Sequence, residues 1–219
     1  MNIEIASKIK QACPQLRLAI ISCEVTNTET SEALWYELEQ EIHHFATSFT
    51  IEDINKRPTI YATRQIYKSL GKDPNRYRPS AEALCRRIVR AIAIYKVSTV
   101  VDIINLVSIR SGFSIGGFDA DKIQGDLKLV IGTANDDFEA IGRGKLNVEG
   151  LPLYKDNIGG IGTPTSDNER TKISLNTSKL LIVINGFSGE MGLSDAIEHS
   201  IELLRKYATL GKYEVKILE

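Results

Sequence analysis

The chain has 219 residues, of which 42% are hydrophobic and 25% are charged, and its formal net charge at pH 7 is −1. This composition excludes disordered and fibrous classes, and no apolar run approaches the roughly 18 residues of a membrane span. The three cysteines form no CxxC pair, which argues against a disulfide framework and a cysteine-rich zinc site. We therefore expect a cytoplasmic protein that has no membrane partner, no metal and no other cofactor.

The first half of the chain is predicted to be mainly helical. A buried strand is expected at 16–25, followed by helices at 31–49, 58–70, 80–92 and 99–111. Ser31 and Ser80 are residue types that cap helices, and Pro58 suits a first helical turn. Gly71 and Gly112 are natural helix ends.

From Gly112 onward, short apolar runs alternate with glycine- and aspartate-rich turns, which predicts a β-rich second half. Strands are expected at 127–131, 146–148, 151–154, 180–184 and 213–218, with one helix beginning at Ser194 and Asp195. Residues 116–119 are interpreted as a turn. Helices clustered early and strands clustered late favour an α+β fold over a doubly wound parallel sheet. Since no linker is evident, we expect one domain over 1–219.

Positive charge is concentrated in one stretch of the sequence. Between Arg57 and Lys96 there are ten Lys and Arg residues against Asp73 and Glu82, a local charge of +8. Four tyrosines, Tyr61, Tyr67, Tyr77 and Tyr95, are interleaved with these basic residues. Basic side chains hold phosphates and exposed aromatic rings stack on unpaired bases, so the stretch is a candidate RNA footprint. The alternative is a solvated pair of helices whose tyrosines fill the core.

Two further patterns are weaker. Residues 112–116 match the Gly-x-Ser-x-Gly pattern of a nucleophile elbow, and Ser114 precedes His199 as in hydrolases. An elbow needs a strand before the serine and a helix after it, whereas here a helix precedes it and a turn follows. His43 and His44 are adjacent, so on a helix they point about 100° apart and cannot share a metal.

A polar loop at 157–172 combines three glycines with hydroxyl and charged side chains. Glycines let the backbone approach a ligand closely, and successive N–H groups can form an anion-binding concavity. The loop lacks the Gly-Lys-Ser/Thr ending of a nucleotide P-loop, so nucleoside triphosphate binding is not expected. The alternative is a long hairpin connection tied by Asp167 and Arg170.

Three segments, 78–87, 101–125 and 160–172, together carry a family resemblance. The combination of Asp102 and Asn105 with the sequence Phe118-Asp119-x-Asp121-Lys122-x-x-Gly125 is its most specific part. The chain resembles the editing domain of the phenylalanyl-tRNA synthetase β subunit, and more closely its stand-alone bacterial homologues. The resemblance covers about 78–187, while 1–56 matches only as the extra strand-and-helix layer of the stand-alone versions.

This resemblance implies a three-layer α+β fold that contains a β-sandwich of unusual topology. In the synthetase this domain removes tyrosine misattached to phenylalanine tRNA, by hydrolysis at a second pocket. The family's sites position a water molecule through hydrogen bonds and stabilise the oxyanion with backbone N–H groups, without a covalent nucleophile. A chain that lacks the adenylate-forming domain cannot charge tRNA by itself.

The resemblance also implies a site where the Asn105 helix, the 116–119 loop and the 159–163 loop converge. The expected catalytic residues are Asn105 and Arg170. The expected ligand-binding residues are Arg110, Gly116, Gly117, Gly159, Gly160, Thr163, Asp167 and Lys172. The expected RNA-binding residues are Arg78, Arg86, Arg87 and Arg90. The chain also has a polar set of its own that could line the cleft or instead form a salt-bridge network that closes the loops: Arg110, Asp119, Asp167, Arg170 and Lys172.

The sequence departs from the synthetase pattern at three positions. Ile104, Gly116 and Val183 stand where a threonine, a histidine and the glutamate that reads the tyrosine hydroxyl are expected. Without a polar reader, discrimination in favour of tyrosine should be lost.

The leading hypothesis is a module that binds the acceptor end of tRNA, and not DNA, and hydrolyses a mischarged aminoacyl ester. The alternatives are a non-catalytic binder of an amino-acid-like ligand or a protein partner, and a serine hydrolase. The last requires His199 within hydrogen-bond reach of Ser114.

Overall fold

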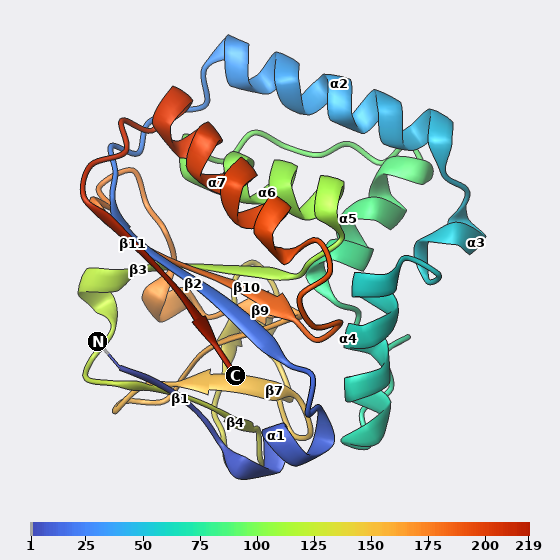
Figure 1. The fold of residues 1–219 in the computed structure, drawn as a ribbon, viewed down its shortest axis with the longest axis vertical. Coiled ribbons are helices and arrows are strands. Elements are labelled where there is room, and N and C mark those ends of the chain that lie inside the picture. The colour runs from blue at the N-terminus through green and yellow to red at the C-terminus, as the bar shows by residue number, and fades with distance from the viewer. Residues whose placement is uncertain (1) are drawn as a thin grey trace.

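A four-stranded antiparallel sheet forms the middle layer of the fold in a computed structural model, which describes residues 2–219. Helices cover one face of this sheet and a five-stranded sheet covers the other (Figure 1). The helices are concentrated in the N-terminal half and most strands lie in the C-terminal half, so the predicted α+β class is confirmed. Among the described residues, no helix has both the length and the apolar character needed to cross a membrane.

The strand order of the middle sheet is β11-β2-β10-β3. Its strands are β2 (Arg17–Glu24), β3 (Ile115–Asp119), β10 (Lys179–Gly186) and β11 (Tyr213–Leu218). Successive residues of a strand point to opposite faces. In β10, Leu180, Ile182 and Ile184 join the core beneath the helices, whereas Leu181 and Val183 join the core between the two sheets. Burial on both faces explains why the sequence of β10 is a continuous apolar run.

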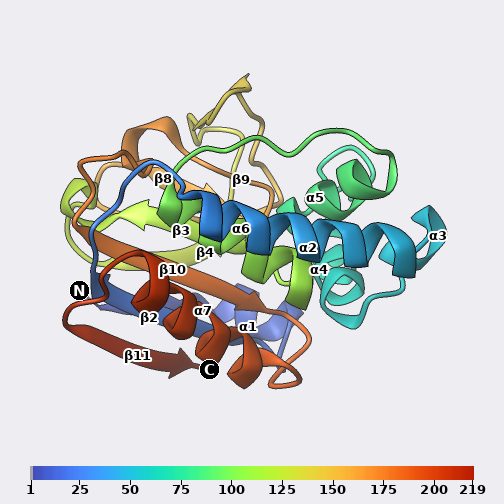
Figure 2. The same ribbon diagram turned by 90° about the horizontal axis from the view of Figure 1, so that it is seen from above.

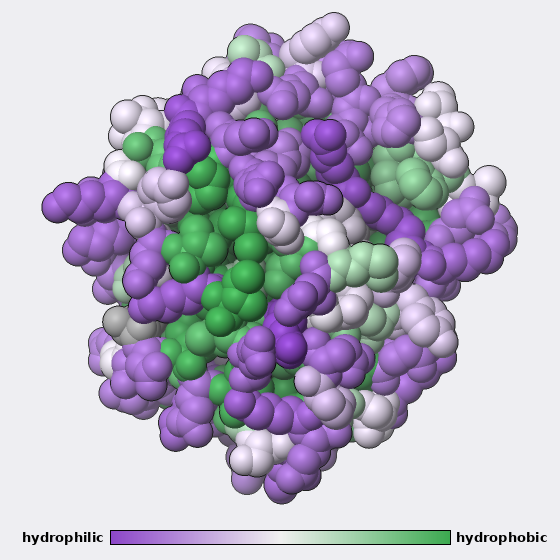
Figure 3. All heavy atoms as spheres, viewed as in Figure 1, coloured by the Kyte–Doolittle hydropathy of each residue, from purple (hydrophilic) through white to green (hydrophobic). Residues whose placement is uncertain are grey.

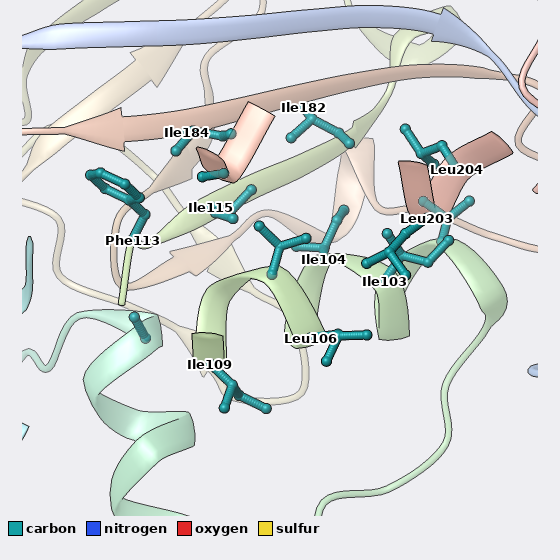
Figure 4. Close-up of a cluster of buried hydrophobic side chains, with 14 of the residues drawn as sticks. Ile103, Ile104, Leu106, Ile109, Phe113, Ile115, Ile182, Ile184, Leu203 and Leu204 are labelled. Carbon is teal, nitrogen blue, oxygen red and sulfur yellow. The ribbon is translucent and has the colours of Figure 1, made fainter. Parts of the chain in front are cut away.

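The helical layer is organised around α6. The helices are α1 (Ser7–Ala12), α2 (Glu32–Ser48), α3 (Ile51–Ile54), α4 (Pro58–Ser69), α5 (Ser80–Val89), α6 (Thr99–Ser111) and α7 (Leu193–Tyr207). Helix α6 packs against α2, α5 and α7, and its Ile103 and Ile104 lie among buried side chains of β10, β3 and α7 (Figure 4). It ends at Gly112 in the left-handed conformation, φ 76°. The Arg57 guanidinium donates to the Ile109 and Arg110 carbonyls at that end, at 2.8 and 2.7 Å.

The outer sheet has the order β1-β4-β7-β8-β9. Its strands are β1 (Ile3–Ile5), β4 (Leu127–Ile131), β7 (Pro152–Lys155), β8 (Gly160–Thr163) and β9 (Ser166–Asp167). A separate short hairpin joins β5 (Glu139–Ala140) to β6 (Gly144–Lys145). Two 3-10 turns span Ala120–Lys122 and Glu169–Thr171. Strands β8 and β9 contact β3, which brings the edges of the two sheets together beside α6.

Several sequence expectations need correction. Residues 116–119 are not a turn: they belong to β3, where Gly116 and Gly117 pair with Val183 and Ile182 of β10. Paired glycines have no side chains to produce the alternation by which a strand is recognised. The expected strand at 146–148 is irregular chain.

Helix α5 is shorter than the apolar spacing predicted. It ends at Val89, which leaves Ile92 beyond the helix and 44% exposed. Ser80 is the first helical residue and not the cap, since the capping position is Pro79 and no side chain caps this helix. By contrast, the Ser31 hydroxyl accepts from the Leu34 N–H at 3.3 Å, so the predicted cap of α2 is confirmed.

Candidate functional site

A cleft of about 600 Å³ opens where α5 and α6 meet β3 and the β8–β9 hairpin. Its apolar wall includes Ile104, Ile115 and Ile173. Its polar lining includes Asn105, Ser108, Thr163, Ser166, Asp167 and Lys172. The β5–β6 turn and Val97 stand at the mouth, since Ile141 and Val97 line the cleft and are 41% and 61% exposed. An apolar cleft with a few convergent polar groups is the usual form of a ligand site.

Asp167 is the most perturbed acid in this cleft. Burial raises the pKa of its carboxyl group to about 7, although the Gly117 N–H, which donates to Oδ2 at 3.2 Å, opposes the shift. The other oxygen, Oδ1, lies so near the backbone that a Cβ atom added at Gly162 would be only 3.0 Å away. A carboxyl group that titrates near neutral pH is suited to taking up and releasing a proton.

The β8–β9 turn explains why Asp167 is placed there. The Thr163 hydroxyl accepts from the backbone N–H groups of Thr165 and Ser166, each at 3.1 Å. This side-chain acceptor fixes a tight reversal at Pro164–Thr165, as hydroxyl side chains do in turns. The backbone of β9 then pairs with β8, with Asp167 opposite Gly162.

Asn105 enters the cleft from α6. It is half-buried, and Ser108 lies one turn further along the same helix face and lines the same cleft. Ser108 donates to the Phe113 carbonyl at 2.8 Å, so its hydroxyl is engaged, and Asn105 is the amide that α6 presents to the cleft.

The two glycines of β3 leave room that other groups occupy. A Cβ atom at Gly117 would lie 2.5 Å from Ile104 Cδ1, and one at Gly116 would lie 2.8 Å from the Phe118 ring. The Cβ atom at Gly116 would also be 3.4 Å from Asp167 Oδ1. The Cβ atom of the histidine that the family resemblance suggests at position 116 would therefore collide with the Phe118 ring and touch Asp167.

Arg170 lies outside the cleft. Its guanidinium makes two bonds to Asp156, at 2.8 and 3.0 Å, and one to the Lys122 carbonyl at 3.1 Å. Burial alone would raise the pKa of Asp156, but Arg170 and backbone N–H groups, including that of Gly159, outweigh it and lower the pKa. This ion pair ties the 156–159 turn to the 3-10 turn at Glu169–Thr171, and the partner of Arg170 is Asp156 instead of the Asp167 considered from the sequence.

Gly159 and Gly160 also lie outside the lining of the cleft. The Gly159 N–H donates to Asp156 Oδ1 at 3.0 Å, and Gly160 packs beneath Phe138 and Leu153. Of the glycines expected at the site, Gly117 lines the cleft and Gly116 lies next to the Asp167 side chain.

Arg110 faces a second cavity, of about 550 Å³, between the end of α6 and helices α4 and α7. There its Nη1 lies 3.5 Å from His199 Nε2. Burial, together with the Arg110 charge, lowers the pKa of His199. Ser114 is buried elsewhere and its hydroxyl accepts from the Ala81 N–H at 3.4 Å. The structure of residues 2–219 therefore does not bring Ser114 and His199 together as a serine hydrolase requires.

The basic stretch is divided between structural and exposed roles. Glu82 is fully buried and pairs with Arg64 and Arg86, each at 2.8 Å, so these two guanidinium groups are engaged inside the helical layer. Arg78 lies 4.0 Å from the same carboxylate and is half-exposed. Arg90 is exposed at the end of α5.

Arg87 is the arginine of this set that lines the cleft. It donates to the Ala93 carbonyl and lies over the ring of Tyr95, 5.6 Å from its centroid. Tyr95 is 70% exposed, whereas Tyr67 is buried in the core. The interleaved tyrosines thus include both core and exposed rings.

The sequence did not indicate some lining residues. Ser108 could have been found, because it follows Asn105 at helical spacing. Arg143 reaches the cleft only because the β5–β6 hairpin folds over it, and nothing in the local sequence marks this. Within residues 2–219, no group of three or more His, Cys, Asp or Glu side chains is arranged to hold a metal ion.

Comparisons with known proteins place this arrangement in a family. The chain is similar to the crystal structure of an N-terminal fragment of the phenylalanyl-tRNA synthetase β-subunit from Pyrococcus horikoshii, with a TM-score of 0.46 and 14% sequence identity. The similarity covers 99% of this chain and 50% of that one, so this chain spans about half the length of the fragment. A search of curated proteins gives no match. The family model of the B3/4 domain matches residues 62–206, well over half of the sequence. The chain therefore belongs to the B3/4 domain family.

Proposed function

We propose that this protein hydrolyses the ester bond of a mischarged aminoacyl-tRNA in trans, with the aminoacyl end held in the cleft between α6 and the β8–β9 hairpin. The observation that carries the proposal is the placement of the Asp167 carboxyl group and the Asn105 amide in one cleft. Burial raises the pKa of the Asp167 carboxyl group to about 7, which suits it to the role of a base. Membership of the B3/4 family, together with the resemblance of 78–187 to the synthetase editing domain, supports an aminoacyl-tRNA as the substrate class.

In the proposed reaction, a water molecule attacks the ester carbonyl carbon. The Asp167 carboxylate accepts a proton from this water, and the Asn105 amide donates a hydrogen bond to the carbonyl oxygen as it gains charge. When the carbon–oxygen bond to the ribose breaks, the proton passes from Asp167 to the departing ribose oxygen. The products are a free amino acid and an uncharged tRNA. No covalent intermediate is needed, in keeping with the engaged hydroxyls of Ser108 and Ser114.

The cleft supports an apolar preference for the amino-acid side chain. Ile104, Ile115 and Ile173 supply an apolar wall. Val183, which stands where the synthetase has its tyrosine reader, is buried between the two sheets and does not line the cleft. A tyrosine hydroxyl in this pocket would therefore not meet the glutamate that reads it in the synthetase, and we expect the selectivity for tyrosine over phenylalanine to be lost.

The mouth of the cleft offers groups suited to a single-stranded RNA end. Arg87, Arg143 and Lys172 line the cleft and supply positive charge, and Lys172 also pairs with Glu169. The exposed ring of Tyr95 beside Arg87 supplies a surface on which a terminal base can stack.

The proposal is tested by deacylation of a panel of mischarged tRNAs, with the wild type, Asn105→Ala and Asp167→Asn. We expect turnover of at least one ester and a loss of roughly 10²- to 10⁴-fold in the Asp167→Asn variant, the usual contribution of a general base. Asp137→Asn is a matched control, because Asp137 is exposed and pairs only with the exposed Lys145. Salt-sensitive tRNA binding without turnover would leave a non-catalytic binder. The absence of both tRNA binding and turnover would refute the tRNA assignment.

A further inference from the structure

The middle sheet has a free edge at β11. This strand is last in the sheet order and pairs only with β2, and it runs along the outer rim of the molecule (Figure 2). Its alternate residues Tyr213, Val215 and Ile217 are 45%, 36% and 53% exposed. Figure 3 shows a band of hydrophobic atoms over the diagonal path of β11 in the view of Figure 1. A six-residue edge strand with exposed apolar side chains is a template for pairing with another strand.

The register with β2 shows which backbone groups are unpaired. Lys212 precedes β11, and its carbonyl accepts from the Glu24 N–H at 2.9 Å. Because hydrogen-bonded positions alternate along an antiparallel pair, even-numbered residues of β11 direct their N–H and C=O groups toward β2. Tyr213, Val215 and Ile217 direct theirs away from it. Among residues 2–219, no other segment pairs with this edge.

We propose that this edge binds a second copy of the chain, with β11 pairing antiparallel to itself about a two-fold axis at Val215. The two four-stranded sheets would then form one continuous sheet. In this register Val215 lies opposite the partner's Val215, and Tyr213 lies opposite the partner's Ile217. Each of the three outward-facing residues donates one hydrogen bond to the other copy and accepts one.

The charges of β11 select this register and this partner. With the axis at Val215, Glu214 lies opposite the partner's Lys216, and the symmetry repeats the pair. Moving the axis by one residue would place Glu214 opposite the partner's Glu214, or Lys216 opposite the partner's Lys216. Like charges directly opposite one another destabilise a pair of strands. In the single chain, Glu214 and Lys216 pair with each other along the strand at 3.0 Å, so both charges are already positioned at the edge.

The apolar side chains fit the same symmetry. Tyr213, Val215 and Ile217 lie opposite Cys23, Ile21 and Ala19 of β2, which belong to the core on the helix-covered face. Pairing would join the exposed rows of the two copies into one strip beside the two α7 helices. The Arg205 guanidinium of α7 donates to the Tyr213 hydroxyl at 2.8 Å, which holds the end of this row against the helix.

Sedimentation velocity of the full chain at about 100 µM tests the proposal, since an interface of modest area is expected to have micromolar affinity. We expect a species of twice 24.3 kDa. Glu214→Lys or Lys216→Glu alone should weaken the dimer roughly 10-fold or more, because each creates two like-charge pairs. The double variant Glu214→Lys/Lys216→Glu should restore it. A mass of 24.3 kDa for the wild type, or a double variant as weak as the singles, would overturn the proposal.

Backbone measurements distinguish this interface from association through side chains elsewhere. In hydrogen-exchange measurements, the amides of Tyr213, Val215 and Ile217 should become protected only as the protein concentration rises. The amides of Glu214 and Lys216 should be protected at every concentration. Val215→Pro removes an outward N–H without removing a bond to β2. It should abolish the dimer and leave the midpoint of thermal unfolding of the monomer unchanged. Equal protection of all these amides at every concentration would contradict the assignment.

Discussion

Replacing Asp167 with asparagine should stabilise the protein at neutral and alkaline pH and change its stability little at about pH 4. Burial raises the pKa of this carboxyl group from 3.8 to about 7, so the folded state disfavours its ionised form. That difference corresponds to about 4 kcal/mol at about 1.36 kcal/mol per pH unit, and partial solvent access reduces the figure to about 2–4 kcal/mol. Asparagine has nearly the same shape and can still accept from the Gly117 N–H, so it retains the local bond without the charge.

The stabilisation by Asp167→Asn should depend on pH. A raised pKa in the folded state costs nothing well below pH 3.8, where the carboxyl group is protonated in both states. The cost grows as pH rises from there to about 7 and is constant above that. Urea unfolding of the wild type, Asp167→Asn and the exposed control Asp137→Asn should be measured between about pH 4 and pH 9. A gain for Asp167→Asn that is the same at every pH, or a loss at about pH 8, would refute the burial of a carboxylate at this position.

Three other substitutions probe the frame of the site. Arg170→Gln leaves the buried Asp156 with backbone donors only, so the free energy of unfolding at neutral pH should fall by about 1–3 kcal/mol. An unchanged free energy of unfolding would show that the ion pair does not stabilise the fold. Glu82→Gln removes the charge that holds Arg64 inside the helical layer and should lower the free energy of unfolding by about 2 kcal/mol or more; unaltered urea midpoints would contradict this. Gly112→Ala forces a side chain into a left-handed position 2.4 Å from a hydroxyl oxygen, so thermal unfolding should occur several degrees lower, and an equal or higher midpoint would be inconsistent with the observed turn.

The start of α2 and the end of α6 could be predicted because nearby residues determine them. Ser31 caps α2 through a bond that depends on four consecutive residues, and Gly112 ends α6 with a conformation that suits glycine. Strand β3 could not be predicted in the same way. Its glycines form a strand only because β10 and the side chains of Ile104 and Ile173 surround them, and these contacts come from distant parts of the chain.

The site shows the same division between local and distant information. The loop at 157–172 carries its polar residues in one stretch, but the sequence could not say which of them face the cleft. The β8–β9 reversal places Asp167 in the cleft, while Arg170 pairs with the buried Asp156 outside the lining of the cleft. Similarly, Arg86 and Arg87 are neighbours in sequence, yet the helical twist sends one to Glu82 and the other to the mouth of the cleft.

The central claim is that Asp167 takes the proton from the attacking water, and the pH dependence of single-turnover deacylation tests it most directly. For the ester identified in the tRNA panel, the rate of the wild type should rise as pH increases through about 7 and then level off, because the ionised carboxylate is the active form. The Asp167→Asn variant should lose this rise and retain only the background increase with hydroxide. A wild-type rate whose pH dependence is unchanged by Asp167→Asn would contradict the account.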